Sequence, residues 1–167
     1  MHPLWSNFFR QRKEQKSLSE MLREIPIFSD LRKGELRKLE KIVHLRRFKP
    51  GEEVFREGEP GVGMYIVRSG GVDIFQRSED GSEQRLAHLG SGDFFGELAL
   101  LDEAPRSATA RATEPTELWG IFRPDLMDLI QRDPRLGVKI VLPLARLVGE
   151  RLRRTNELLK KTSEVEG

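Results

Sequence analysis

The chain has 167 residues, of which 37% are hydrophobic, enough for one well-cored domain with flanking helices but not for two ordinary domains. Its 29 Lys and Arg barely exceed its 27 Asp and Glu, so net charge alone does not indicate nucleic-acid binding. The absence of cysteine excludes disulfides, thiolate nucleophiles and cysteine-ligated zinc, and it fits a reducing compartment. No apolar run is long enough for a transmembrane segment, and the first residues do not resemble a secretory signal. We therefore expect a soluble, cytoplasmic protein.

Residues 1–24 are expected to form an N-terminal arm and a first helix. In this arm the aromatic residues Trp5, Phe8 and Phe9 precede a basic stretch from Arg10 to Lys16. This pattern is compatible with a segment that lies on a membrane surface or docks on a partner. The preferred interpretation is a solvated arm, or a helix that packs on its own domain.

Apolar residues at helical spacing predict two short helices before the main body of the chain. They extend from Leu18 to Ile27 and from Leu31 to Leu45, with Ser29 as the N-cap of the second. The Pro50-Gly51 pair then predicts a turn that ends the helical region.

Between Glu53 and Phe122 the pattern changes to short strands separated by turn residues. Asp80-Gly81 predicts a hairpin, because both residues tolerate the positive φ angles of tight turns. Many short strands at nearly regular spacing favour a jelly roll. We expect residues 25–133 to form a double-stranded β-helix (jelly-roll) sandwich of the α+β class, mainly β, with flanking helices. The expected strands are Val54–Phe55, Met64–Val67, Val72–Phe75, Arg85–Leu89, Ala108–Ala112 and Glu117–Phe122.

Helical spacing returns after Phe122, first over Pro124–Gln131 and then from Asp133-Pro134 onward. Residues 134–167 are expected to form a long C-terminal helix with a polar tail, kinked at Pro143 because proline lacks an amide N–H. An apolar stripe along this helix predicts a homodimer seam, and packing against its own barrel is the alternative. The stripe comprises Val141, Leu144, Val148, Leu152, Thr155 and Leu159.

The segment most informative about function is the long excursion between two strands, Phe94 to Ala110. Its apolar run Leu98–Leu101 predicts one helical turn, whose free backbone N–H groups at residues 96–99 form an anion site. Arg106 can reach the same anion through charge-assisted hydrogen bonds. Glu97 would repel a phosphate, but it can accept a hydrogen bond from a ribose hydroxyl beside the phosphate.

Two sequence patterns resemble those of cyclic-nucleotide-binding domains. Residues 95–100 (FGELAL) and 105–109 (PRSAT) look like the phosphate-binding cassette found in the catabolite activator protein and in regulatory subunits of cyclic-AMP-dependent protein kinase. Residues 54–61 (VFREGEPG) and 64–67 (MYIV) are similar to a second pattern of that family. The resemblance covers the chain from about Ile25 to Phe122, with both patterns in the right order.

The resemblance implies a role for each matching residue. Glu97 accepts the ribose 2′-hydroxyl, Arg106 binds the cyclic phosphate, and Ser107 completes the phosphate site with the cassette amides. Other candidates are apolar residues near the sugar and purine, and polar residues of the last helix that meet the purine across a dimer. Apolar strand residues are, however, more often simply core, and an arginine on an exposed helix is more often a surface residue. The candidate ligand-binding residues are Phe95, Gly96, Glu97, Leu98, Ala99, Arg106, Ser107, Ala108, Ile74, Leu86, Ala87, Arg151, Thr155 and Asn156.

We therefore expect a stand-alone regulatory module that binds cyclic AMP, with cyclic GMP as the second choice. It would signal by rearranging its last helix or through a protein effector. Because the sequence stops at Gly167 without a helix-turn-helix element, the alternative is a Crp/Fnr-type transcription regulator that lacks its DNA-binding domain. A module that keeps the fold but binds no nucleotide is disfavoured by the intact Glu97 and Arg106.

A cupin-type metalloenzyme is a further alternative for a jelly roll. His2, His44 and His88 are scattered, and no two of them lie at strand-alternating or helical spacing with a carboxylate partner. We therefore expect no metal, no cofactor and no catalytic residues.

Overall fold

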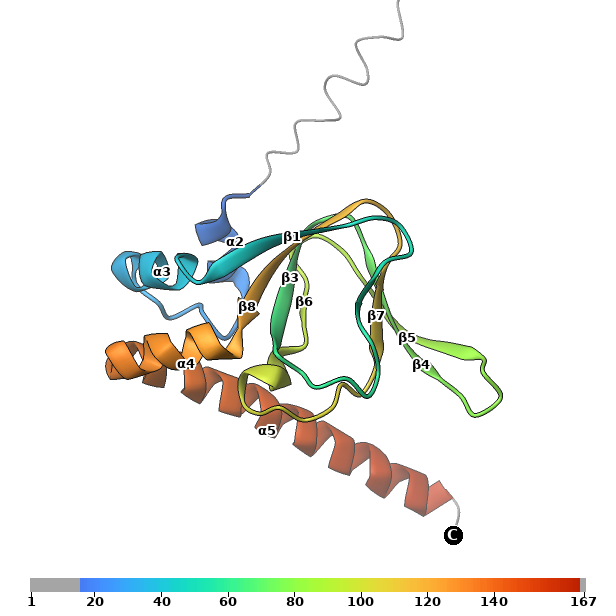
Figure 1. The fold of residues 1–167 in the computed structure, drawn as a ribbon. Helices are drawn as coiled ribbons and strands as arrows, with labels where there is room; N and C mark the ends of the chain where they lie inside the picture. The colour runs from blue at the N-terminus through green and yellow to red at the C-terminus, as the bar shows by residue number, and fades with distance from the viewer. Residues whose placement is uncertain (1–15, 166–167) are drawn as a thin grey trace, which may run out of the picture.

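The computed structural model describes residues 16–165, which form two antiparallel four-stranded sheets with helices gathered at one end (Figure 1). One sheet has the order β1-β8-β3-β6 and the other the order β2-β7-β4-β5. The expected α+β jelly-roll sandwich is confirmed. Of the expected N-terminal arm and helix, residues 1–24, the part up to residue 15 lies outside the described residues. The strands are β1 (Val43–Phe48), β2 (Glu53–Phe55), β3 (Gly63–Ser69), β4 (Val72–Arg77), β5 (Glu83–Leu89), β6 (Phe94–Phe95), β7 (Thr109–Ala112) and β8 (Thr116–Phe122).

The expected second helix, Leu31 to Leu45, is wrong in its second half. Helix α3 (Lys33–Glu40) ends five residues earlier, and β1 begins at Val43. Strand β1 pairs antiparallel with β8, so that Val43 lies opposite Ile121. A short apolar run is compatible with both a helix and a strand. Here the paired strand β8, which is far away in sequence, determines that these residues form a strand.

The N-terminal helices begin with capping residues that differ from the expected one. Helix α2 (Leu18–Glu24) begins after Ser17, whose hydroxyl accepts a hydrogen bond from the Glu20 amide at 3.2 Å. Before α3, the Arg32 amide donates to the Glu35 carboxylate at 3.1 Å, so Ser29 is not the N-cap. The Ser29 hydroxyl instead donates to the carbonyl of Pro26.

The Asp80-Gly81 hairpin is confirmed between β4 and β5, and Gly81 has the positive φ of 83° that such a turn requires. Strand β6 was not predicted. It has only two residues, and its pairing with Tyr65 and Ile66 of β3 decides its conformation.

The buried apolar residues form two clusters, and the expected cassette contributes to both. Phe95 packs inside the sandwich with residues such as Val67 and Leu118. Leu100 packs in the other cluster, which lies between the helices and the first sheet and includes Phe28. The segment from Phe95 to Leu100 therefore spans the gap between the two cores, and burial at both ends fixes its position.

Helix α4 (Arg123–Arg132) is followed by the long α5 (Pro134–Val165), which continues through Pro143 and extends past the sandwich (Figure 1). The expected stripe along α5 has two different environments. Leu144 is buried against the protein's own core, as the alternative interpretation predicted. Leu152 and Leu159, by contrast, are 59% and 62% exposed. The dimer prediction therefore concerns only the second half of the helix.

Candidate functional site

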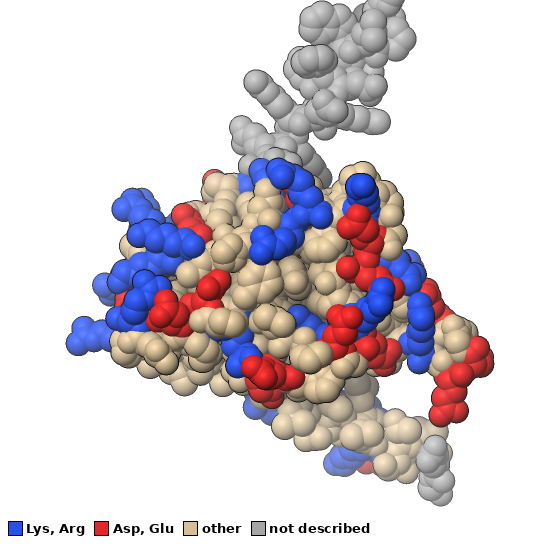
Figure 2. All heavy atoms as spheres, viewed as in Figure 1, with Lys and Arg blue, Asp and Glu red and all other residues tan. Residues whose placement is uncertain are grey.

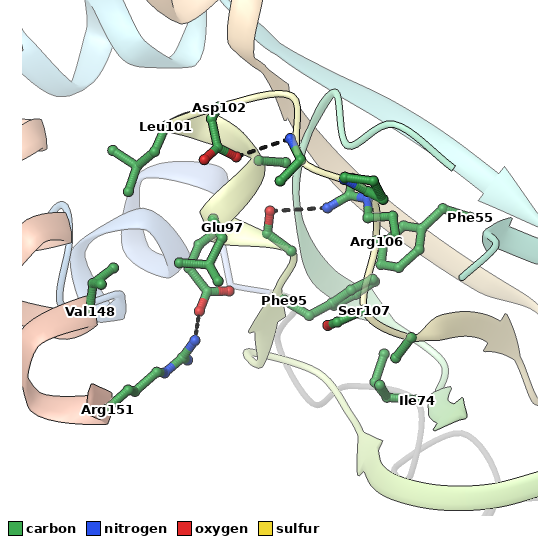
Figure 3. A pocket seen from close by; sticks show the side chains of 16 residues that line it. Phe55, Ile74, Phe95, Glu97, Leu101, Asp102, Arg106, Ser107, Val148 and Arg151 are labelled. Carbon is green, nitrogen blue, oxygen red and sulfur yellow. Dashed lines mark hydrogen bonds and ion pairs between the residues drawn. The ribbon is translucent and has the colours of Figure 1, made fainter. Parts of the chain in front are cut away.

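A cavity of about 430 Å³ lies between the cassette, the strands of the sandwich and α5 (Figure 3). Its volume is in the range of about 300–1,000 Å³ usual for small-molecule sites, and its lining is mostly apolar with a few polar groups. The residues that line it are Phe55, Ile74, Phe95, Gly96, Glu97, Leu98, Ala99, Leu101, Asp102, Ala104, Pro105, Arg106, Ser107, Ala108, Val148 and Arg151.

The expected helical turn of the cassette is confirmed as the 3₁₀ turn η2 (Glu97–Leu100). Gly96 precedes it with a φ of 76°, a conformation that favours glycine. The amides of Glu97 and Leu98 have no hydrogen-bond acceptor within residues 16–165, so they are available to an anion. The Ala99 amide is not, because it donates to the Gly96 carbonyl at 3.2 Å, and this part of the expected anion site is wrong.

Arg106 is held in the cavity by two backbone carbonyls rather than by a carboxylate. Its Nη1 donates to the Gly96 carbonyl at 3.2 Å and its Nη2 to the Gly63 carbonyl at 2.6 Å. The guanidinium also stacks on the Phe55 ring, 3.9 Å from its centroid. Its Nε is buried and has no acceptor among the described residues.

Burial lowers the pKa of Arg106 from its usual value, because the cavity wall removes water from the charge. An arginine nevertheless stays protonated at neutral pH. The guanidinium is thus a partly desolvated cation without an ion pair to any other residue in the described part of the chain, and a bound anion would compensate it.

The loop between β2 and β3 supports the cassette from behind. The Gly58 amide donates to the Arg106 carbonyl at 2.8 Å, and the Arg106 amide donates to the Glu59 carbonyl at 2.8 Å. A Cβ on Gly61 would lie 2.8 Å from the Ala99 side chain, so a larger residue would push the cassette away. This support gives a physical reason for the pattern at residues 54–61, which carried part of the family resemblance.

Glu97 projects from η2 and is only 3% exposed. Its Oε1 contacts Nη1 of Arg151 on α5 (Figure 3), and the Arg151 side chain is itself 52% exposed. A buried carboxylate needs a compensating partner, and here the long helix supplies it. The contact joins the cassette directly to α5.

Aromatic rings form the wall of the cavity on the side of the sandwich. Phe55 lies 5.8 Å from Phe95, which in turn stacks on Tyr65 at 5.6 Å. Sequence reasoning did not select Phe55 as a site residue, although it lies in the pattern at residues 54–61. Only the fold brings β2 opposite the cassette.

Most of the predicted binding residues line the cavity, and four do not: Leu86, Ala87, Thr155 and Asn156. Leu86 is 50% exposed on β5, and Ala87 lies opposite Ile74 in the ladder. Thr155 and Asn156 are exposed beyond Arg151 on α5, and the Thr155 hydroxyl donates to the Arg151 carbonyl. The lining residues that were not predicted are Phe55, Leu101, Asp102, Ala104, Pro105 and Val148.

The structure also bears on a metal centre and on a membrane-spanning segment. Across residues 16–165 no three His, Asp or Glu side chains are grouped closely enough to hold a metal ion. His44 and His88 each lie beside a single aspartate, Asp125 and Asp73. None of the helices described in this range is long and apolar enough to cross a membrane.

Comparison with known proteins places this geometry in a family. Residues 45–133, more than half of the chain, match the model of the cyclic nucleotide-binding domain. The chain is 39% identical over 125 residues to the cyclic AMP receptor protein of Thermus thermophilus, an alignment that covers 75% of the chain and 58% of that relative. It is also 39% identical over 120 residues to a putative potassium channel protein of Rhodopseudomonas palustris, covering 72% of the chain and 29% of the relative.

The fold agrees with these matches. The structure of the regulatory domain of Toxoplasma gondii cyclic-AMP-dependent protein kinase with cyclic AMP superimposes with a TM-score of 0.62 at 31% identity, covering 67% of this chain and 42% of that one. The chain spans less than two thirds of the length of each of these relatives. The match to the domain itself extends over the sandwich, the cassette and α4. The chain therefore belongs to the cyclic nucleotide-binding domain family.

Proposed function

We propose that this chain is a regulatory module, not an enzyme, that binds cyclic AMP in preference to cyclic GMP in the cavity beside the cassette. One observation carries the proposal. The half-buried guanidinium of Arg106, without an acidic partner within residues 16–165, shares its cavity with the amides of η2 and with the carboxylate of Glu97. These groups meet the demands of a ligand that carries both a negative phosphate and a neutral hydroxyl.

The arrangement suggests how the ligand lies. The cyclic phosphate accepts hydrogen bonds from Arg106 and from the Glu97 and Leu98 amides. The ribose 2′-hydroxyl donates to the Glu97 carboxylate, and the base lies along the apolar wall that includes Phe55 and Ile74. The cavity lining contains no histidine or lysine, and its single hydroxyl, that of Ser107, has no base beside it, which favours binding over catalysis.

The choice of cyclic AMP rests on the relatives. One is named a cyclic AMP receptor protein, and one structural neighbour contains cyclic AMP. A relative from Mycobacterium tuberculosis, named a CRP-like cAMP-activated global transcriptional regulator, supports a second candidate, a Crp/Fnr-type transcription regulator that lacks its DNA-binding domain. Both candidates use the same cavity and differ only in what the nucleotide controls.

Arg106→Ala is expected to weaken cyclic AMP binding by roughly 100-fold or more, because it removes at least two charge-assisted hydrogen bonds of about 1.5–3 kcal/mol each. Isothermal titration calorimetry with cyclic AMP and cyclic GMP measures the loss and identifies the preferred nucleotide. Arg132→Ala, an exposed arginine on α4, is the matched control and should bind as the wild type does. Equal binding by wild type and Arg106→Ala would place the ligand elsewhere.

Glu97→Gln should weaken binding of cyclic AMP by roughly tenfold or more, since a hydrogen bond to a charged acceptor becomes one to a neutral amide. The loss should nearly vanish for 2′-deoxy-cyclic AMP, which has no hydroxyl to donate. Calorimetry of both ligands with both proteins gives the coupling between the carboxylate and the hydroxyl. An equal loss for the two nucleotides would show that Glu97 acts on the fold of the cassette and not on the ribose.

The output is proposed to pass through α5. Val148 and Arg151 of this helix line the cavity, and Arg151 contacts the carboxylate that the ribose is to approach. A ligand can shift the helix only if it binds the two arrangements with different affinity. The Glu97–Arg151 contact is a physical basis for such a difference.

Cyclic AMP should therefore change hydrogen-exchange protection within residues 133–159, most strongly around Arg151. Mass spectrometry of exchange at saturating nucleotide tests this, with Arg106→Ala at the same nucleotide concentration as the control. Unchanged protection in α5, with calorimetry showing a filled site, would exclude the helix as the output.

The second half of α5 is proposed to form a homodimer seam. Leu152 and Leu159 are seven residues apart and largely exposed, which is the spacing of two-helix coiled coils. Thr155 and Asn156 lie on this same segment. A dimer is the arrangement in which the resemblance gives them a role near the purine.

Leu152→Glu combined with Leu159→Glu should convert the dimer to a monomer in sedimentation velocity, because two carboxylates would enter an apolar seam. Leu158→Glu with Val165→Glu is the matched control. It also introduces two glutamates seven residues apart, but on a helix face about 100° away from the seam. This control variant should remain dimeric. A monomeric wild type at high protein concentration would refute the seam.

A further inference from the structure

The small net charge of the chain conceals a strong segregation of charge. Residues 10–49 contain 13 Lys and Arg against six Asp and Glu, whereas residues 50–167 contain 16 against 21. The first segment thus has a formal charge of +7 and the rest a charge of −5. Because exposed charges are screened over about 8 Å at physiological salt, the remote acidic residues do not cancel the local field of the basic segment.

Four exposed cations of this basic segment lie on or directly after α2 and α3, and we call them the α2–α3 face: Arg23, Lys33, Arg37 and Lys41. All four side chains are exposed, and none has an ion pair with another residue in the described range 16–165. Figure 2 shows Lys and Arg side chains gathered over α3, on the left of the view.

Each of the four acidic groups of the two helices has a partner outside the α2–α3 face: two are paired with a lysine, Glu40 accepts from the Ser19 hydroxyl, and Glu20, which lines the hollow described below, accepts from a backbone amide. Glu24 pairs with Lys16 at 2.6 Å, and Glu35 pairs with Lys139 at 2.8 Å. The Glu20 carboxylate accepts a hydrogen bond from the Ser17 amide at 2.9 Å. The cations of the α2–α3 face are therefore left to interact with an external anion.

Three of these cations converge on a hollow. It has a volume of about 300 Å³ and lies between α2 and α3. The Ser17 hydroxyl adds hydrogen-bonding capacity beside the guanidinium and ammonium groups, whereas the Ser19 hydroxyl already donates to the Glu40 carboxylate. The residues that line the hollow are Ser17, Ser19, Glu20, Arg23, Lys33, Leu36 and Arg37.

The hollow shares no lining residue with the nucleotide cavity. In Figure 1 the helices α2 and α3 lie at the opposite end of the molecule from the C-terminal part of α5. A flat anionic surface could therefore contact the α2–α3 face without covering the cavity or the exposed part of the long helix.

The residues that precede α2 indicate which anionic surface fits. The sequence before α2 combines Trp5, Phe8 and Phe9 with four basic residues at positions 10–16. Aromatic side chains favour the membrane–water interface, and basic ones favour anionic headgroups. For a segment without a lipid anchor, membrane affinity increases with the apolar area that it buries and with its electrostatic attraction to anionic lipids.

We propose that the α2–α3 face docks on an anionic phospholipid membrane and holds a lipid phosphate group in the hollow. The proposal is independent of the nucleotide bound at the cassette. Membrane binding would place the module at the membrane surface. The cavity and α5 would remain accessible there.

The test is co-sedimentation of the full chain with vesicles. Phosphatidylcholine vesicles that contain about 30% phosphatidylglycerol should bind the protein at about 0.1 M salt, and binding should be largely lost at about 0.5 M salt or with pure phosphatidylcholine. Lys33→Glu combined with Arg37→Glu should weaken binding at least roughly 25-fold, at about fivefold per basic residue removed.

Lys160→Glu with Lys161→Glu makes the same change of net charge at the far end of α5 and should bind vesicles like the wild type. Calorimetry with cyclic AMP should show that both double variants keep the wild-type affinity, which excludes misfolding. No binding to anionic vesicles, or an equal loss in both variants, would overturn the proposal. Tight binding to a duplex DNA or RNA oligonucleotide in place of vesicles would assign the face to nucleic acid and overturn it as well.

Discussion

Two opposite charges, the carboxylate of Glu97 and the guanidinium of Arg106, lie in one sheltered cavity and are not paired with each other. Glu97 is compensated by Arg151 from α5, and Arg106 is held by the carbonyls of Gly96 and Gly63. A direct pair would neutralise both groups and leave nothing for a ligand. Keeping them apart costs desolvation free energy, and the protein recovers it only in part through carbonyls and a half-exposed arginine.

The cassette tolerates this desolvation free energy because burial fixes both of its ends. Phe95 packs in the sandwich core and Leu100 in the core beneath the helices, while the loop of Gly58 and Gly61 supports Arg106 from behind. The helices thus do more than cover one end of the sandwich. Since η2 rests on the same buried cluster as α2, α4 and the start of α5, movement of the cassette affects a shared core.

The molecule separates its surfaces along its length. The cavity beside the cassette faces the middle of α5, and the exposed leucines lie on the second half of that helix. The α2–α3 face, whose basic residues have no ion pair within residues 16–165, lies at the other end. The proposed binding of a nucleotide, a second copy and a membrane would therefore use separate surfaces. This compatibility is what a module needs if it senses a small molecule at one place and acts at another.

Local sequence determined the parts whose chemistry lies within a few neighbouring residues. The Asp80-Gly81 hairpin, the turn at residues 97–100 and the grouping of Glu97 with Arg106 follow from backbone preferences and charge within one short segment. The family resemblance rests on the same kind of contiguous pattern.

Tertiary structure alone decided everything that depends on a partner distant in sequence. Strand β1 replaced the end of an expected helix because β8 pairs with it, and Phe55 joined the cavity because β2 lies across from the cassette. The Ala99 amide is not available to an anion, because in the folded turn it donates its hydrogen bond to the Gly96 carbonyl. The pairing of Arg151 with Glu97, 54 residues apart, likewise required α5 to pack beneath the sandwich. Such contacts depend on long-range burial and hydrogen bonding, which no local pattern of side chains encodes.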